Sequence, residues 1–257
     1  METSPPPWRP PRLWRGAQAL ARGIVALLSR LEITGDLPAQ LRAQPLILAA
    51  NHISTFDPIV LAAACRARGI SPRFMATGGL FRTPVIGPLM RHCGHIRVDR
   101  RDVSVADALR HATEALTGNS VVLVYPEGRI GLDPQMWPER GKTGTARLAL
   151  AAGVTVVPVT QWGAHEVLPY AAPKGLGRAV ARALWRRPVV RVHFGTPVDL
   201  DGLTPGAPGA ALRATERITA ALTRDLRPLR ADEPDLPRHV DPTRPTETRR
   251  TWRPPSA

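Results

Sequence analysis

The sequence predicts one α/β domain in which helices flank a largely parallel or mixed sheet. Three observations favour this class. Short apolar runs of strand length alternate along the chain with segments of helical periodicity. The runs are mostly apolar from end to end, as in strands that helices cover on both faces. The 257 residues, 43% of them hydrophobic, provide one sizeable core and do not require a second domain.

The first expected element is an amphipathic helix over residues 13–31. It follows a proline- and arginine-rich arm, residues 1–12, which we expect to be disordered. Its apolar residues recur at near-helical spacing: Leu13, Leu20, Ile24, Leu27, Leu28 and Leu31. Because three arginines interrupt it, the segment is expected to lie on a membrane surface and not to span the membrane. The alternative is a helix that packs on the domain's own core.

Strands and helices then alternate from residue 46 onward. Six strands are expected, at Leu46–Ala50, Arg73–Ala76, His95–Val98, Val121–Tyr125, Thr155–Thr160 and Val189–Phe194. Four helices are expected, at Pro58–Arg68, Ser104–Leu116, Thr143–Ala152 and Ala210–Leu226. From Pro228 the chain loses periodicity, so we expect the domain to cover residues 13–227 and residues 228–257 to form a disordered tail.

A histidine and an aspartate lie five positions apart where the first of these strands meets the first of these helices. His52 and Asp57 on one strand-to-helix turn are the parts of an oriented general base. The structural alternative is a helix cap. Aspartate suits the N-cap and Pro58 the first helical position, which would leave His52 as a polar loop residue. These residues alone leave both interpretations open.

Two further charged clusters follow expected strands. Arg97 and Arg100 lie at the end of the strand at residues 95–98, where guanidinium groups suit a phosphate. Glu127, Gly128 and Arg129 follow the strand that ends near residue 125. A glycine there permits a tight turn or close approach of a substrate, while the carboxylate and the arginine can bind a polar headgroup and hold each other. Taken singly, each cluster is equally compatible with a solvated strand end or a surface ion pair.

Together the clusters resemble the glycerolipid acyltransferase family, and within it the 1-acylglycerol-3-phosphate (lysophosphatidate) acyltransferases. Four family motifs occur in the family's order and at similar spacing, over about residues 45–165. They are Asn-His-x4-Asp at Asn51, His52 and Asp57, Gly-x5-Arg at Gly94 and Arg100, Pro-Glu-Gly at Pro126, Glu127 and Gly128, and Val-Pro-Val at Val157, Pro158 and Val159. The resemblance implies a glycerol-3-phosphate acyltransferase-like fold.

The chain departs from the family pattern at two places. Arg129 stands where the family often has threonine after Pro-Glu-Gly, which concerns acceptor contacts. Thr77-Gly78-Gly79 stands where a charged Lys-x-Glu element is common, which concerns acyl-donor contacts. Lys142 resembles a basic residue that the family places after its third motif.

The resemblance implies acyl transfer from a thioester to an alcohol. Neutral His52 would take the proton of the sn-2 hydroxyl of lysophosphatidate, and Asp57 would orient the imidazole. Arg100, with Arg129 and Lys142, would bind the acceptor phosphate, while Glu127 and Gly128 would complete the substrate-binding site. The product is phosphatidate, for phospholipid biosynthesis. The expected donor is acyl-CoA or an acyl-carrier protein thioester, with no cofactor and no metal.

Composition is consistent with a lipid substrate at a membrane. The net charge is +14, and only Lys142 and Lys174 among the 35 basic residues are lysines. This excess reflects either coding bias or an anionic partner such as an acidic membrane surface, to which the basic stretch 174–191 would bind. Nucleic acid is disfavoured because only 5% of residues are aromatic. Cys65 and Cys93 show no metal or redox spacing, which favours a reduced, peripheral or monotopic protein on the cytoplasmic face of the membrane.

Other functions remain open to the sequence. The acceptor could be another lyso-lipid or glycerol 3-phosphate, with the same chemistry. A metal-dependent hydrolase would use His52, Asp57, His92 and His95, although the last two are closely spaced for one site. A catalytically inactive lipid-binding protein is the third alternative, for which the intact motifs give no support.

Overall fold

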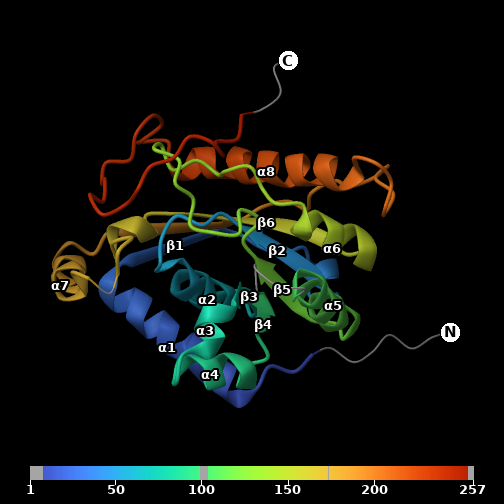
Figure 1. The fold of residues 1–257 in the computed structure, drawn as a ribbon. Coiled ribbons are helices and arrows are strands. Elements are labelled where there is room, and N and C mark those ends of the chain that lie inside the picture. The colour runs from blue at the N-terminus through green and yellow to red at the C-terminus, as the bar shows by residue number, and fades with distance from the viewer. Residues whose placement is uncertain (1–7, 99–103, 173, 254–257) are drawn as a thin grey trace.

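A seven-stranded sheet forms the middle layer of the computed structural model, which describes residues 8–98, 104–172 and 174–253 (Figure 1). The order is β1-β7-β6-β2-β5-β3-β4. Strands β2 to β6 pair in parallel, whereas β7 is antiparallel to β6 and parallel to β1. The strands are β1 (Arg30–Gly35), β2 (Leu46–Ala50), β3 (Arg73–Thr77), β4 (Ile96–Val98), β5 (Val121–Val124), β6 (Thr155–Trp162) and β7 (Val189–Phe194). The predicted α/β class is confirmed.

Helices cover both faces of the sheet. They are α1 (Arg12–Leu28), α2 (Asp57–Ala67), α3 (Gly78–Arg82), α4 (Ile86–His92), α5 (Ser104–Thr117), α6 (Gly144–Ala152), α7 (Leu176–Arg186) and α8 (Ala210–Leu229), with short 3-10 helices η1 (Ala39–Leu41) and η2 (Ala164–Glu166). Helices α1 and α2 lie on one face and α7 packs beside α1, while α5, α6 and α8 lie on the other (Figure 1).

The central strand β2 shows why uninterrupted apolar runs predict strands of a sheet that helices cover on both faces. Leu46, Leu48 and Ala50 belong to the core beneath α1 and α2, whereas Ile47 and Ala49 belong to the core beneath α5, α6 and α8. All five side chains are fully buried. Burial of a leucine or isoleucine contributes roughly 2 kcal/mol, so both faces of β2 stabilise the layers. The carboxyl end of this strand is consequently held rigidly at one edge of the sheet.

All six predicted strands and four predicted helices are present, with boundaries that differ by at most three residues. The sequence did not predict β1, α3, α4 or α7. Strand β1 was missed because apolar spacing appeared helical through Leu31, whereas the helix ends at Leu28 and Ser29 donates its hydroxyl to the carbonyl of Val25, 2.8 Å away. The partner of β1 is β7, about 160 residues later, which local periodicity does not reveal.

The N-terminal amphipathic helix is present as α1 and packs on the domain core. Trp14, Val25 and Leu28 are buried on its inner side. Its outer side exposes Leu20 and Leu27, which are 66% and 60% accessible. The helix therefore contributes to the core and also presents an apolar outer surface. No helix within the described ranges is both long and apolar enough to cross a membrane.

The predicted disordered tail differs from the structure, which describes residues 228–253 in contact with the domain. Arg230 is fully buried, and its guanidinium lies 4.1 and 4.4 Å from the ring centres of Trp137 and Trp162. Glu233 accepts a hydrogen bond from the indole of Trp162 at 2.9 Å. Periodicity did not reveal this packing because its contacts are polar and cation–π. In the predicted N-terminal arm, the backbone N–H of Trp8 likewise donates to the backbone carbonyl of Asn119 at 3.3 Å.

Candidate active site

The end of β2 is tied to the end of β6 by paired amides. The side-chain amide of Asn51 donates to the carbonyl of Gln161 at 3.0 Å, and the backbone N–H of Gln161 donates to the side-chain oxygen of Asn51 at 2.8 Å. Both side chains are fully buried. Buried amides with several partners leave the backbone little freedom. The next residue, His52, therefore leaves the sheet from a fixed point.

His52 and Asp57 meet as the sequence predicted. Nδ1 of the imidazole lies 2.8 Å from Oδ2 of the aspartate, which is fully buried. A carboxylate can only accept here, so Nδ1 carries the proton and Nε2 is left as the basic nitrogen. Oδ2 also accepts the backbone N–H groups of Ile53 and Ser54, at 2.6 and 2.8 Å. Three donors thus hold one carboxylate oxygen, which in turn orients the ring.

The helix-cap alternative for Asp57 is only partly correct. The residue is the first of α2, the N-cap is Phe56, and no side-chain hydrogen bond caps the helix. The carboxylate binds the preceding loop instead of the helix amides. Its place in the first turn of α2 still suits an acidic residue, because the helix dipole interacts favourably with acidic side chains there. The structural and proposed catalytic roles of this residue are therefore compatible.

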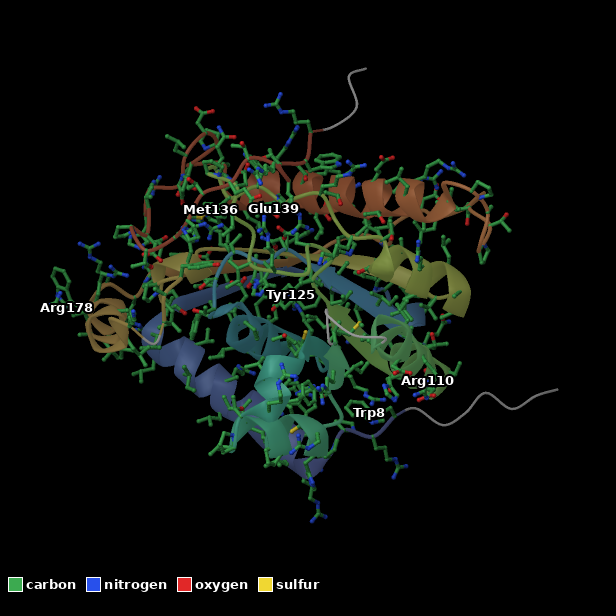
Figure 2. The ribbon with its side chains drawn as sticks, viewed as in Figure 1. Trp8, Arg110, Tyr125, Met136, Glu139 and Arg178 are labelled. Atoms are coloured by element: carbon green, nitrogen blue, oxygen red, sulfur yellow. The ribbon has the colours of Figure 1, made fainter. Side chains whose placement is uncertain are left out.

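Tyr125 stacks on His52 and was not anticipated. The two ring centres are 4.0 Å apart and the ring planes differ by 16°. Figure 2 shows Tyr125 in the middle of the molecule, just below the sheet. Strand register explains the contact, because β5 pairs directly with β2 and the two residues follow the ends of these strands. The stacked ring limits rotation of the imidazole.

Glu127 lies behind the site and supports the loop that carries His52. Its side chain is only 2% accessible. One carboxylate oxygen accepts the backbone N–H of His52 at 2.9 Å, and the other accepts that of Glu139 at 3.1 Å. Gly131 fits closely beside it, since an added Cβ would lie 2.6 Å from Glu127 Oε2. The structure thus gives Glu127 a supporting position, whereas the sequence interpretation gave it a substrate contact.

Burial raises the pKa of Glu127 to about 8, with the charges of Glu139 and Asp57 acting in the same direction and the two backbone donors opposing them. The folded chain then keeps a proton that the unfolded chain has released above pH ~4.5. This contribution to stability is lost as pH rises toward 8. Burial lowers the pKa of His95 and His165 to about 4 and 3, so their contributions change mainly below pH 6.5.

We expect the free energy of unfolding to fall between pH 6.5 and 8 with a Glu127 contribution that approaches about 1.4 kcal/mol per pH unit. In Glu127→Gln this slope should become shallower, because the amide does not titrate. Urea unfolding followed by circular dichroism at pH 6.5, 7.2 and 8.0 measures both slopes. Equal slopes in the parent chain and the variant would show that Glu127 is already ionised at pH 6.5.

His52 lies in the wall of a cavity of about 640 Å³, within the size range of small-molecule sites. Most of the cavity is apolar and extends between α1, α2, β3 and α5. The apolar lining includes Trp14, Ala17, Ala21, Ile59, Ala62, Phe74, Met75, Leu80, Met90, Val98 and Leu109. An apolar space of this kind suits a hydrocarbon chain.

The other end of the cavity is cationic. Gly128, Arg129 and Lys142, all predicted from the sequence, line it together with Arg147 and the N-terminal residues of α6. Gly128 has a φ of +71°, and an added Cβ would lie 3.3 Å from a side-chain carbon of Lys142. The absence of a side chain at Gly128 therefore leaves room for the lysine side chain. Arg147 was missed because only the path of α6 brings it to the cavity. A helix N-terminus with basic side chains is a suitable environment for a phosphate.

Arg129 does not pair with Glu127 as the sequence suggested. Its guanidinium lies 3.3 Å from a carboxylate oxygen of Glu139 and 3.0 Å from one of Glu247. Glu127 is instead committed to backbone amides. Arg100, the remaining predicted phosphate ligand, lies outside the residues that the structure describes.

The other motif residues support the backbone around the site. Gly94 lies between α4 and β4, and its carbonyl accepts a hydrogen bond from the side chain of Arg73. The carbonyl of Pro126 accepts the N–H of Lys142 at 2.8 Å, which positions the lysine loop. Pro158 lies inside β6. None of these residues contributes a reactive side chain.

The residues of the metal alternative do not gather into a ligand set. His95 accepts the backbone N–H of Phe74 at 3.1 Å and lines the apolar cavity, whereas His92 is not among the residues of the cavity wall. Across the described part of the chain, no three side chains of histidine, cysteine, aspartate or glutamate lie close enough to hold one ion. The geometry at His52 and Asp57 is that of an oriented base.

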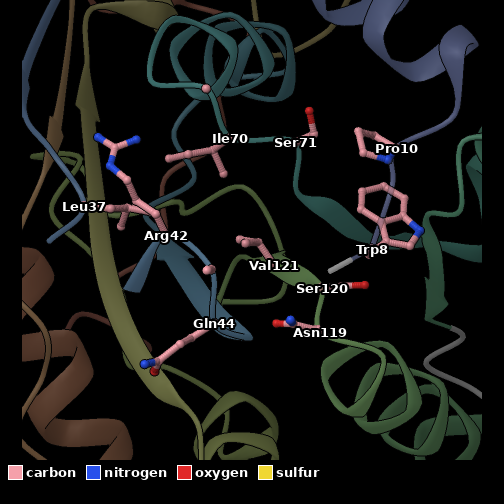
Figure 3. Close-up of a pocket in the computed structure, with 12 residues that line it drawn as sticks. Trp8, Pro10, Leu37, Arg42, Gln44, Ile70, Ser71, Asn119, Ser120 and Val121 are labelled. Carbon is pink, nitrogen blue, oxygen red and sulfur yellow. The ribbon is translucent and has the colours of Figure 1, made fainter. Parts of the chain in front are cut away.

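A smaller hollow of about 170 Å³ lies at the opposite edge of the sheet (Figure 3). Gln44, Ser71 and Val121 line it near the amino ends of β2, β3 and β5. Ligands of parallel α/β sheets bind at the carboxyl ends of the strands. The hollow's single charged residue, Arg42, is paired with Asp36. We assign no function to it.

A family model described as Acyltransferase matches residues 30–162. The chain is 29% identical over 157 residues to "1-acyl-sn-glycerol-3-phosphate acyltransferase BAT2, chloroplastic" of Brassica napus, which covers 61% of this chain and 43% of the relative. It is 34% identical over 129 residues to the corresponding enzyme of Chlamydomonas reinhardtii, with 49% and 36% covered. Human "Lysophospholipid acyltransferase LPCAT4" is 32% identical over 159 residues, with 59% and 28% covered. The chain thus spans less than half the length of these relatives.

A solved structure shares the fold. It is the 1-acyl-sn-glycerophosphate (LPA) acyltransferase PlsC from Thermotoga maritima, with a TM-score of 0.62 and 22% sequence identity. The match covers 85% of this chain and 80% of that chain. The similarity therefore extends well beyond the four motifs to most of the sheet and its helices.

Proposed function

This chain belongs to the acyltransferase family, and from that premise we propose that it transfers a fatty acyl group from a thioester to the sn-2 hydroxyl of 1-acylglycerol 3-phosphate, forming phosphatidate. One observation carries the proposal. The His52–Asp57 pair lies in the wall of a single cavity with a long apolar part and a cationic end. The names of the curated relatives support lysophosphatidate as the acceptor.

In the proposed reaction, Nε2 of His52 takes the proton of the acceptor hydroxyl while its oxygen attacks the thioester carbonyl. The tetrahedral intermediate collapses and expels the thiolate, which takes the proton back from the imidazolium. Asp57 holds Nδ1–H throughout and stabilises the positive ring. No acyl-enzyme is needed, because the thioester is already activated. Acyl-CoA or an acyl-carrier protein thioester is the proposed donor, and no cofactor takes part.

The cationic end is the proposed site of the acceptor phosphate. Lys142, Arg147 and the N-terminus of α6 would bind it, with Arg129 beside them. Arg100 is retained as a proposed ligand on the strength of its motif alone. With the phosphate at this end and the acyl groups in the apolar part, the sn-2 hydroxyl comes to His52 between them.

Replacing Arg147 by glutamine is expected to raise KM for lysophosphatidate about tenfold and to change kcat less than threefold. One charge-assisted contact to phosphate is worth about 1.5–3 kcal/mol, and it acts mainly on binding. The matched control is Arg140→Gln, since Arg140 is exposed and does not line the cavity. An unchanged KM in Arg147→Gln would place the phosphate elsewhere.

We also propose that the protein binds the cytoplasmic face of a membrane peripherally. The exposed leucines of α1 and the 82% exposed Trp185 of α7 provide apolar contacts. The basic residues of α7, among them Arg178 at the periphery of the molecule in Figure 2, favour anionic lipid. Lysophosphatidate resides at such a surface.

An acceptor panel tests the proposed function. Purified protein is given acyl-CoA with lysophosphatidate, other lysophospholipids or glycerol 3-phosphate, and lipid products are separated by mass spectrometry. We expect kcat/KM to be highest for lysophosphatidate. The relative named as a lysophospholipid acyltransferase makes a second lyso-lipid the alternative acceptor. A higher kcat/KM for that acceptor would replace lysophosphatidate in the proposal.

A further inference from the structure

We propose that Arg244 is a positioning residue for acyl transfer and that the segment from Asp241 to Thr251, here called the C-terminal strap, ties the two motif loops together. Its consequence for catalysis rests on the proposed function, because the loops act through His52. The strap follows α8 and lies near the end of the chain, in red in Figure 1. Residues of the described chain that lie more than a hundred positions apart meet there.

The guanidinium of Arg244 joins the two loops directly. One terminal nitrogen donates to the carbonyl of Ile53 at 2.6 Å, inside the first motif loop. The other donates to the carbonyl of Gly131, in the loop after Glu127. The planar fork of a guanidinium holds its donors at fixed spacing, so one side chain sets the distance between two carbonyl groups. The N–H of Gly131 donates in turn to the carbonyl of His52 at 2.7 Å, which closes a ring of contacts.

The strap also brings positive charge to a group of buried carboxylates. Besides Glu127, which burial keeps protonated near neutral pH, three acidic residues near the motif loops are at most 3% accessible: Asp57, Asp133 and Glu139. Carboxylates buried without opposite charge are strongly destabilising. Arg250 pairs with Glu139 at 3.5 Å and donates to the carbonyl of Glu127 at 2.9 Å. Arg244 also experiences the charge of Asp57.

A third contact reaches the cationic end of the cavity. The carboxylate of Glu247 lies 3.0 Å from the guanidinium of Arg129, and its backbone N–H donates to the carbonyl of Leu132 at 2.8 Å. The strap therefore touches the loop of the base, the loop of Glu127 and an arginine of the proposed phosphate site. If the loops shift by about 1 Å, misalignment of base and hydroxyl costs about a hundredfold in rate.

The test compares Arg244→Gln with Arg249→Gln in the full chain. Arg249 is an exposed arginine of the same strap and serves as the matched control. Amide hydrogen exchange is measured by mass spectrometry, and acyl transfer from acyl-CoA to lysophosphatidate is measured on the same preparations. We expect Arg244→Gln to exchange about tenfold faster in residues 51–56 and 128–133 while β6 keeps its protection. We expect kcat to fall about tenfold or more, with KM for acyl-CoA within threefold of the parent.

Hydrogen exchange needs no substrate. If the parent chain is inactive, the proposed function is refuted, but the exchange rates still show whether Arg244 holds the two loops. The inference is overturned if both loops of Arg244→Gln exchange as in Arg249→Gln. It is also overturned if the loops loosen while kcat of an active parent changes less than twofold. If Arg244→Gln loses protection from exchange throughout the sheet, the variant has lost its fold, and Arg244→Lys is measured in its place. Lysine keeps the positive charge but lacks the planar fork of the guanidinium. In Arg244→Lys, the exchange rates of the loops and kcat should therefore lie between those of the parent and those of Arg244→Gln. Values equal to those of the parent would overturn the inference.

Discussion

Replacing His52 by alanine is expected to lower kcat for acyl transfer at least about a thousandfold, because the reaction then has no base near the acceptor hydroxyl. The fold should remain intact. The side chain is 16% accessible at the cavity wall, and Asp57 keeps the N–H groups of Ile53 and Ser54 as partners. The loss of stacking on Tyr125 removes about 1 kcal/mol, which shifts the melting temperature by only a few degrees.

The matched control for this change is His111→Ala, since His111 is exposed on α5. Initial rates are measured with acyl-CoA and lysophosphatidate, and both variants are checked by circular dichroism and thermal melting. His111→Ala should retain the rate of the parent chain. A His52→Ala variant that keeps more than a tenth of the parent kcat would rule out His52 as the base.

Replacing Asp57 by asparagine is expected to lower kcat about a hundredfold or more while largely preserving the geometry of the loop. The three hydrogen bonds to Asp57 converge on Oδ2, and an amide oxygen in that position can accept them. The negative charge that stabilises the imidazolium is lost. KM for lysophosphatidate should change little, because Asp57 lies outside the cavity lining.

Asp107→Asn provides the control for this prediction, as Asp107 is an exposed aspartate of α5. Hydrogen exchange of residues 51–56 shows whether the loop keeps its structure in Asp57→Asn. A preserved loop with a low kcat supports an electrostatic role for the carboxylate. A preserved loop with the parent kcat would leave Asp57 as a structural residue only.

The sequence could predict the fold wherever local patterns decide the structure. Buried strands such as β2 are covered on both faces, so their uninterrupted apolar runs are visible without knowledge of their neighbours. Strand β1 lacked this signal, because it lies at the sheet edge and depends on pairing with β7. The strap gave no periodic signal either, since arginine, glutamate and backbone carbonyl groups make its contacts.

The candidate site likewise contains residues whose proximity the sequence predicts and residues that only the fold brings together. His52 and Asp57 lie on one short loop, so their spacing in the sequence already implies that they can meet. Tyr125, Arg147 and Arg244 reach the site through strand pairing, a helix path and the strap, none of which their neighbours in sequence reveal.

For Glu127, the sequence interpretation differs from what the structure shows. Its motif position suggested contact with a substrate, but its burial and its two backbone partners only become visible in three dimensions.

The most direct test of the central claim measures thiol release and lipid product together, with acyl-CoA and lysophosphatidate and equal concentrations of the parent chain and His52→Ala. The parent chain should release one thiol for each phosphatidate formed, and only when lysophosphatidate is present. His52→Ala should release thiol at no more than about a thousandth of that rate. Equal rates in the two proteins, or thiol release by the parent without phosphatidate, would contradict the account.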